Sequence, residues 1–391
     1  MFFPIDAEKW AYALGQIRRL RHRGCWDRIG SSDSYWNLVF FAALVESVDS
    51  MLLEEPRLAL ELSAQGILLA ERIRTEDCPG GTEVGKRSLR AWAHAIRGSA
   101  CRAAELYDEA EDAFAQATWL ATSRAVLPWA AAEVDRRYAA LLVYRGSLGQ
   151  GLALVNRALE AYAEYPVGRA KALLIRAVYY QQLLRDPAQA ALDLGLALEL
   201  IEPKNSPSEA RLWVAAVHNL NYVYAMGCSD LTALRVTLRQ VHGLAKKLSK
   251  NEGYRRALCA WTEALLIAPL GSTRWAKRLL IKARAWLFKH RYYHPGTLCA
   301  IDLATLHLRD SEEEDARAVL EDLGLKLAAA KPATATYLEY WLELRLPQNL
   351  LKENLAAFRA AIVPLGAQGS GMFQPSTMII GATSGSSPAT D

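Results

Sequence analysis

The clearest indication of the architecture is Trp92-Ala-His-Ala-Ile-Arg-Gly98, followed after a short gap by Tyr107-Asp-Glu-Ala-Glu-Asp-Ala-Phe-Ala-Gln-Ala117. Apolar and small residues recur in it at spacings of three and four, which is typical of amphipathic helices. Gly98 and Ala110 are small, so two helices can approach closely where these residues meet. The stretch therefore predicts two helices packed as a hairpin.

The same spacing continues along the chain, and valine-rich alternating segments are absent, so we expect an all-α protein. Proline lacks an amide donor and disfavours helix in the residue before it, so each proline- or glycine-containing break is expected to separate two helices. The breaks are Glu55-Pro56, Pro79 to Gly81, Pro128, Pro166, Asp186-Pro187, Pro203 to Pro207, Gly271-Ser272, Pro295-Gly296, Pro332 and Pro347.

The hairpins repeat loosely, because a small residue marks the second helix of each one at intervals of 39 to 51 residues. These anchors are Ala59, Ala110, Gly151, Ala190, Ala233, Ala276 and Ala316. Seven residues after the anchors stand Gly66, Ala117, Ala158, Ala197, Gln240, Ala283 and Leu323. Most of these are again glycine or alanine, so we expect the same helix face to be packed closely in about seven hairpins.

At Gly98, Ala110, Phe114 and Ala117 the chain resembles the tetratricopeptide repeat (TPR) family, whose pattern places glycine, alanine, a large apolar residue and alanine in this order. Other hairpins depart from the pattern, for example at Ser63, and most intervals are longer than the family's usual repeat. They are similar to the helical sensor domains of bacterial signalling and transcription regulators. The resemblance implies an α-solenoid with a right-handed superhelical path.

This interpretation divides the chain into four parts. Residues 1–55 are expected to form N-terminal capping helices, at Asp6 to Arg23 and Asp33 to Leu53, and residues 56–346 the TPR-like array. Residues 347–364 are expected to form a C-terminal capping helix. Residues 365–391 are rich in glycine, serine and threonine and nearly uncharged, which predicts a disordered tail.

The resemblance implies that the first helix of each hairpin lines a concave groove, and it assigns residues to that groove. They are Arg102, Arg136, Arg137, Arg176, Tyr179, His218, Asn219, Tyr222 and Trp261. Arginine and aromatic residues supply much of the binding energy at protein interfaces. In the other interpretation of these residues, the arginines pair with acids such as Glu133 or Asp135, and Tyr179 and Tyr222 fill the space between repeats.

We therefore expect a non-enzymatic scaffold, sensor or adaptor that binds a protein or peptide segment in the groove. The alternative is a regulatory protein associated with nucleic acid, or with a transcription or signalling complex, through the basic stretches Arg18 to Arg23 and Arg274 to Arg291. Overall charge does not favour nucleic acid, because 46 basic residues face 42 acidic ones. The sequence names neither the partner nor the oligomeric state.

Catalytic residues, a metal and a cofactor are not expected, because no phosphate loop, nucleophile elbow or metalloprotease motif occurs. The best metal candidate is His290 with His294 and Cys299, which would make a metal-dependent hydrolase the third hypothesis. The six cysteines stand singly, which is typical of reduced thiols, and the longest apolar run, Leu38 to Val45, is too short to span a membrane. We expect a cytoplasmic protein.

Overall fold

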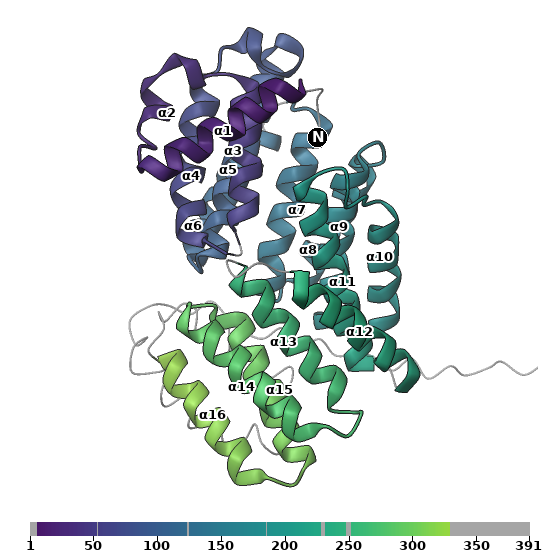
Figure 1. Cartoon of the computed structure of the whole chain (residues 1–391). Helices are drawn as coiled ribbons and strands as arrows, with labels where there is room; N and C mark the ends of the chain where they lie inside the picture. Colours follow the sequence, from purple (N-terminus) through teal and green to yellow (C-terminus); the bar gives the residue numbers. More distant parts are fainter. Residues whose placement is uncertain are drawn as a thin grey trace, which may run out of the picture.

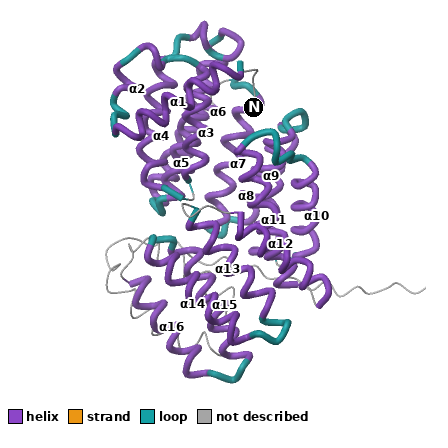
Figure 2. Tube along the Cα trace, viewed as in Figure 1, coloured by secondary structure: helices purple, strands orange, loops and turns teal. Residues whose placement is uncertain are grey.

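The computed structural model of this chain describes residues 6–52, 54–122, 125–184, 186–227, 231–247 and 252–328. Helices account for 84% of this part, which holds no β-strand, so the all-α prediction is confirmed (Figure 2). The α-helices are α1 (Ala7–Arg23), α2 (Arg28–Ser31), α3 (Leu38–Met51), α4 (Pro56–Arg72), α5 (Glu83–Ala103), α6 (Tyr107–Thr122), α7 (Pro128–Tyr144), α8 (Leu148–Ala161), α9 (Pro166–Val178), α10 (Pro187–Glu199), α11 (Pro207–Gly227), α12 (Leu231–Lys247), α13 (Gly253–Ile267), α14 (Thr273–Lys289), α15 (Tyr293–Arg309) and α16 (Glu313–Ala328). The predicted C-terminal helix and tail, and the end of the predicted array, lie outside the described residues.

Consecutive helices pack against each other as hairpins from α3–α4 to α15–α16. The first helices of successive hairpins also touch, at α3 with α5, α5 with α7, α7 with α9, α9 with α11, and α11 with α13. Figure 1 shows this order in space: α1–α6, α7–α12 and α13–α16 form successive parts of the molecule. Neighbours along the chain are therefore also neighbours in the fold.

Most of the predicted breaks mark helix starts, because proline fits the first helical turn, where its missing N–H has no intrahelical partner. Pro56, Pro128, Pro166, Pro187 and Pro207 are each the first residue of a helix. The prediction at Pro295-Gly296 is wrong in detail. Both residues lie in the first turn of α15, and the break falls earlier, next to Arg291, whose φ is 63°.

Small residues let the two helices of a hairpin pack closely at the positions that the sequence pattern predicts. A Cβ on Gly98 would lie 2.7 Å from Cε2 of Phe114, so only glycine lets α5 and α6 approach this closely. Ala110 and Ala117 are fully buried in the same interface. In the fifth hairpin the predicted register is wrong, because Gln240 is exposed and Val241 is buried in its place.

The N-terminal segment covers the first hairpin. Asp6 accepts hydrogen bonds from the backbone N–H groups of Glu8 and Lys9 and so caps α1, which packs on α3. The bounds of α1 agree with the predicted helix at Asp6 to Arg23. The segment predicted as a second capping helix contains α3, which also forms the first hairpin with α4.

Side chains far apart in the sequence join the first two hairpins to the last two described hairpins. The carboxylate of Glu54, after α3, accepts hydrogen bonds from the backbone N–H groups of Tyr254 (3.0 Å) and Arg255 (3.4 Å) at the start of α13. Glu105, after α5, accepts one from the N–H of Tyr293 at the start of α15 (2.8 Å). Carboxylates stabilise helix N-termini, so these contacts hold the last hairpins against the first two.

Candidate binding cavity

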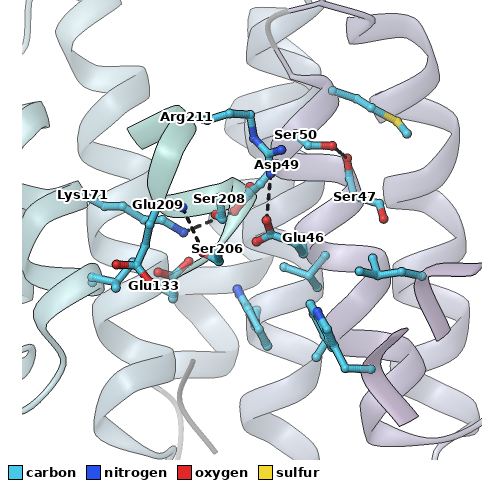
Figure 3. Close-up of a pocket in the computed structure, with 18 of the residues that line it drawn as sticks. Glu46, Ser47, Asp49, Ser50, Glu133, Lys171, Ser206, Ser208, Glu209 and Arg211 are labelled. Carbon is cyan, nitrogen blue, oxygen red and sulfur yellow. Dashed lines mark hydrogen bonds and ion pairs between the residues drawn. The ribbon is translucent and has the colours of Figure 1, made fainter. Parts of the chain in front are cut away.

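A cavity of about 590 Å³ lies between the first helices of the hairpins and α1. Trp10, Leu14 and Ile17 of α1 and Trp92 of α5 contribute apolar side chains to its wall. The C-terminal half of α3 and the facing parts of α7, α9 and α11 contribute charged and hydroxyl groups (Figure 3). The cavity therefore combines an apolar wall with a polar one.

Arg137 of α7 is the centre of the polar wall. Its side chain is 3% exposed, and its two terminal nitrogens donate to both carboxylate oxygens of Asp49 on α3, each at 2.8 Å. Its Nε donates to Glu133 Oε2, also at 2.8 Å. A buried arginine with two carboxylate partners is held rigidly, so Arg137 fixes α3 relative to α7.

Glu133 is buried one helical turn before Arg137. It accepts hydrogen bonds from Arg136 Nη2 and from the hydroxyl of Tyr162, both at 2.7 Å. Burial alone would raise the pKa of the Glu133 carboxyl, but Arg136 and Arg137 outweigh burial and hold this pKa well below its usual range. Burial and Arg137 oppose each other in the same way at Asp49, whose pKa is also lowered. Both groups are therefore anions at neutral pH.

A second ion pair crosses the cavity from α3 to α11, where Arg211 Nη2 lies 2.8 Å from Glu46 Oε1. Burial raises the pKa of Glu46, and the nearby Lys171 and Arg211 only partly offset this effect. Lys171 of α9 lies between these acids, with its Nζ 3.7 Å from Asp49 Oδ2 (Figure 3). Three carboxylates and several cations thus surround one space.

Of the predicted groove residues, Arg137 lines this cavity and Arg136 lies behind it. Arg176 faces another part of the molecule, where it forms two hydrogen bonds of 2.8 Å with the buried Asp193. The guanidinium of Arg102 lies over the ring of Tyr144, 5.3 Å from its centroid. The predicted arginines therefore do not gather in one place.

The predicted aromatic residues lie inside the fold. Tyr179 is fully buried, and its hydroxyl donates to the backbone oxygen of Ala139 at 2.8 Å. The rings of Tyr222 and Trp261 meet edge to face at 5.5 Å, and Trp261 Nε1 donates to Asp302. All three side chains are buried between helices, which for Tyr179 and Tyr222 agrees with the second interpretation of the sequence.

The two remaining predicted residues are consecutive on α11 and do not line the cavity. His218 Nδ1 lies 3.1 Å from Thr262 Oγ1, and burial lowers the pKa of the imidazole to about 4, so this ring is neutral near pH 7. Asn219 is half-buried. Binding of a partner by the full predicted set stays a prediction.

Sequence reasoning missed Glu46, Asp49, Lys171 and Arg211 as members of a site. One signal was present, since Glu46 and Asp49 follow the apolar run Leu38 to Val45 on a helix whose neighbouring residues are buried. Acidic residues on such a helix need partners, because an unpaired buried charge is strongly unfavourable. The sequence does not show which cations those partners are.

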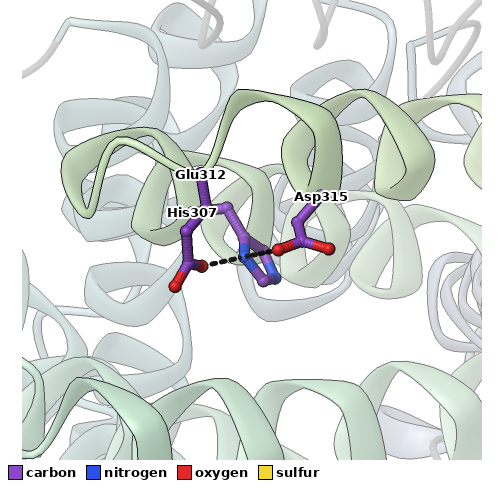
Figure 4. Close-up of side chains that lie close together, drawn as sticks. All are labelled: His307, Glu312 and Asp315. Carbon is purple, nitrogen blue, oxygen red and sulfur yellow. Dashed lines mark hydrogen bonds and ion pairs between the residues drawn. The ribbon is translucent and has the colours of Figure 1, made fainter.

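A second cluster of titratable groups lies between α15 and α16, where the ligand atoms of His307, Glu312 and Asp315 lie within 4.8 Å of one another (Figure 4). His307 Nδ1 lies 2.6 Å from Glu312 Oε2, and Lys277 Nζ lies 2.5 Å from the same oxygen. Lys277 thus already supplies a cation to this carboxylate. The arrangement is that of an ion-paired helix start, with Glu312 directly before α16.

Two of the three residues of the metal candidate from the sequence, Cys299 and His290, have other contacts in the described part of the chain. This cysteine is fully buried, and its thiol lies 3.5 Å from the backbone oxygen of Leu280. The ring of His290 stacks on Trp286 at 4.2 Å. The side chain of His294 lies outside the described residues. All five cysteines in the described part of the chain are free thiols.

The basic stretches are partly neutralised by acidic neighbours. In the first stretch, Arg21 forms an ion pair with Glu55 at 2.6 Å. In the second, Lys277 pairs with Asp310 and Arg284 with Asp322. These contacts reduce the positive charge that each stretch offers to a phosphate backbone.

No known protein family matches the chain, and no curated protein sequence matches it. Within the described ranges, no helix has both the length and the apolar character needed to cross a bilayer. The cavity and its charged wall are therefore the features from which a function can be argued.

Proposed function

We propose that this protein is a non-enzymatic sensor or adaptor that binds a short segment of a protein or peptide in the cavity between α3 and α7–α11. The observation that carries the proposal is this cavity of about 590 Å³, which lies where the first helices of successive hairpins converge. Ligand-binding clefts commonly measure about 300–1,000 Å³ and place a few polar groups in a largely apolar wall. The cavity has both properties, and a few residues of a peptide would fill it.

The repeat arrangement supports the same proposal. We propose a TPR-like array of about seven hairpins that follows a right-handed superhelical path, with the first helices on its inner side. The contacts between successive first helices and the close approach at Gly98 and Phe114 fit such an array. Stacked repeats create extended concave surfaces that hold other proteins.

The charge states of Asp49 and Glu133 support binding without chemistry at these two groups, while Glu46, whose pKa is raised by burial, is engaged in an ion pair with Arg211. A general base works best when its pKa is near the operating pH. The pKa values of Asp49 and Glu133 are held low by arginines, and both carboxylates are occupied by hydrogen bonds. Such groups position a ligand and its surrounding helices.

The test is a peptide selection followed by affinity measurements on two matched variants. Peptides from a random library are selected on the full chain, and their dissociation constants are measured for the wild type, Val167→Trp and Val236→Trp. Val167 lines the cavity, whereas Val236 is exposed on α12, so the same substitution fills the cavity in one variant only.

We expect Val167→Trp to weaken binding at least tenfold and Val236→Trp to leave it unchanged, with wild-type helicity in both variants by circular dichroism. Equal affinities for the wild type and Val167→Trp would show that peptides bind elsewhere and would refute the proposal.

A further inference from the structure

We infer that the cavity accepts an uncharged apolar side chain of a peptide and rejects a charged one. This inference rests on the proposed function, since it names the part of the peptide that enters the cavity. We commit to a peptide segment whose entering residues are aliphatic or aromatic. Its charged residues would stay outside the cavity, in water.

The charged side chains that line the cavity are balanced in number. Five of them are cations and five are acids. Three of each form one network in the polar wall: Arg137, Lys171 and Arg211 with Glu46, Asp49 and Glu133. The lining therefore carries no excess charge for a ligand to neutralise.

Each cation of this network already has carboxylates close to it. Arg137 and Arg211 each lie 2.8 Å from a carboxylate oxygen of α3, and Lys171 Nζ lies 3.7 Å from another. Burial alone would raise the pKa of each of the three carboxyls, and the positive charge of Lys171 opposes burial at all three. Arg136 bonds Glu133 from behind and does not line the cavity. A charged ligand group would lose its hydration here without gaining an unpaired counter-ion.

The other four charged side chains of the lining lie at its edge. Arg18, Arg21 and Glu164 are exposed. Glu209 is half-buried and accepts a hydrogen bond from the backbone N–H of Glu202. Charges in contact with water are screened and need no counter-ion from a ligand. Since two of the four are cations and two are acids, the edge favours neither sign of charge.

The hydroxyl groups that α3 contributes to the cavity are also occupied. Ser47 Oγ donates to the backbone oxygen of Ala43 at 2.8 Å, and Ser50 Oγ donates to that of Ser47 at 2.7 Å. Both hydroxyl protons are thus bound within α3 itself. A polar ligand group would have to break one of these hydrogen bonds to gain a donor from this helix.

The apolar wall is therefore what the cavity offers to a ligand. Trp10, Leu14 and Ile17 line the cavity from α1, spaced at three and four residues on one helix face, together with Val45 and Trp92. Apolar surface of a ligand that covers these side chains leaves water without disturbing an ion pair. An aliphatic or aromatic residue gains most from such a wall.

The first test uses three capped peptides that differ only in their central residue: acetyl-Leu-Met-Leu-amide, acetyl-Leu-Glu-Leu-amide and acetyl-Leu-Lys-Leu-amide. Methionine is similar in length to the two charged side chains but carries no charge. Each peptide is titrated by calorimetry at pH 8 into the full chain, Glu46→Gln and Glu61→Gln. Glu61 is exposed on α4 and does not line the cavity, so Glu61→Gln is the matched control.

We expect the wild type to bind the methionine peptide at least about tenfold more tightly than either charged peptide, because a charged side chain would be desolvated without a counter-ion. Glu46→Gln removes one negative charge and leaves Arg211 without its partner. The glutamate peptide should therefore bind this variant at least about tenfold more tightly than the wild type, while the lysine peptide gains nothing. Glu61→Gln should behave as the wild type does.

The converse variant is Lys171→Met, which leaves the carboxylates in excess, so that the lysine peptide should gain affinity and the glutamate peptide should not. Circular dichroism checks the helicity of each variant. Three results would each overturn the inference: no binding of the methionine peptide to the wild type, binding of a charged peptide that is as tight, or affinities for the charged peptides that change in neither Glu46→Gln nor Lys171→Met.

Failure of this inference is distinguishable from failure of the proposed function. If Val167→Trp weakens the selected peptides but the charge of the central residue has no effect, the cavity binds peptides and only the preference for an uncharged side chain is wrong. If Val167→Trp leaves both the selected and the capped peptides unaffected, the cavity is not the binding site and the proposed function itself is wrong.

Discussion

Replacement of Arg137 by methionine should destabilise the fold strongly, because this side chain is buried and satisfies two carboxylates at once. Asp49 would keep only Lys171 at 3.7 Å, while Glu133 would keep Arg136 and Tyr162. Removal of one partner from a buried ion pair costs about 3–5 kcal/mol. Since part of the compensation remains, we expect a loss of about 3 kcal/mol in the free energy of unfolding at pH 7.5.

The assay is urea unfolding followed by circular dichroism, with Arg157→Met as the matched control. Arg157 also binds both oxygens of an aspartate, Asp135, but its side chain is 62% exposed, and exposed ion pairs contribute about 0–1 kcal/mol. We therefore expect Arg157→Met to lose at most about 1 kcal/mol.

The loss at Arg137→Met should also depend on pH in a defined direction. In the wild type, the lowered pKa values of Asp49 and Glu133 keep both groups charged down to acidic pH. Without Arg137, burial raises these pKa values, so the folded variant takes up protons as the pH falls and regains stability relative to the wild type. The difference between the two proteins should therefore be smaller at pH 5 than at pH 7.5. A loss equal to that of Arg157→Met, or one that does not change with pH, would refute this reasoning.

Two further substitutions test the packing of the hairpins and the charge of the cavity wall. Gly98→Ala should destabilise the protein by about 1–2 kcal/mol, because the new Cβ would meet the ring of Phe114. Gly15→Ala is the control, because nothing lies within 4 Å of a Cβ there, and it should stabilise the protein by about 0.5–1 kcal/mol. Equal effects of the two substitutions in thermal unfolding would contradict the close approach of α5 and α6. For Glu46, whose pKa is raised by burial from 4.5, the folded state binds the proton more tightly than the unfolded chain does. The free energy of unfolding of the wild type relative to Glu46→Gln should therefore fall as the pH rises above about 4.5. The measurement is urea unfolding of both proteins from pH 4 to 7. A difference in unfolding free energy that rises or stays constant over this range would speak against a raised pKa.

The helices and their close contacts could be predicted because their signals are local. Proline marks a helix start from within the helix itself. Gly98 packs against Phe114 of the same hairpin, so this contact also joins residues fewer than twenty positions apart. The periodicity also locates the buried face of most second helices. It fails in the fifth hairpin, where the face is shifted by one residue and Gln240 is exposed.

The cavity could not be predicted from these signals. Arg137 and Asp49 are 88 residues apart, and Arg211 and Glu46 are 165 apart. Whether such residues meet depends on how each hairpin is rotated relative to the next. These rotations accumulate along the chain, so a small change in each one would bring a side chain against a different helix. The sequence pattern did place Arg137 among residues that face a binding surface, and Arg137 lines the cavity, but its two acidic partners could not be assigned.

A crystal structure of the full chain with a selected peptide would show directly whether the cavity is the binding site. We expect the peptide to lie in the cavity between α3, α7 and α9, with its apolar side chains against Trp10 and Leu14. A peptide bound on the outer surface of the second helices, with the cavity unchanged, would contradict this expectation.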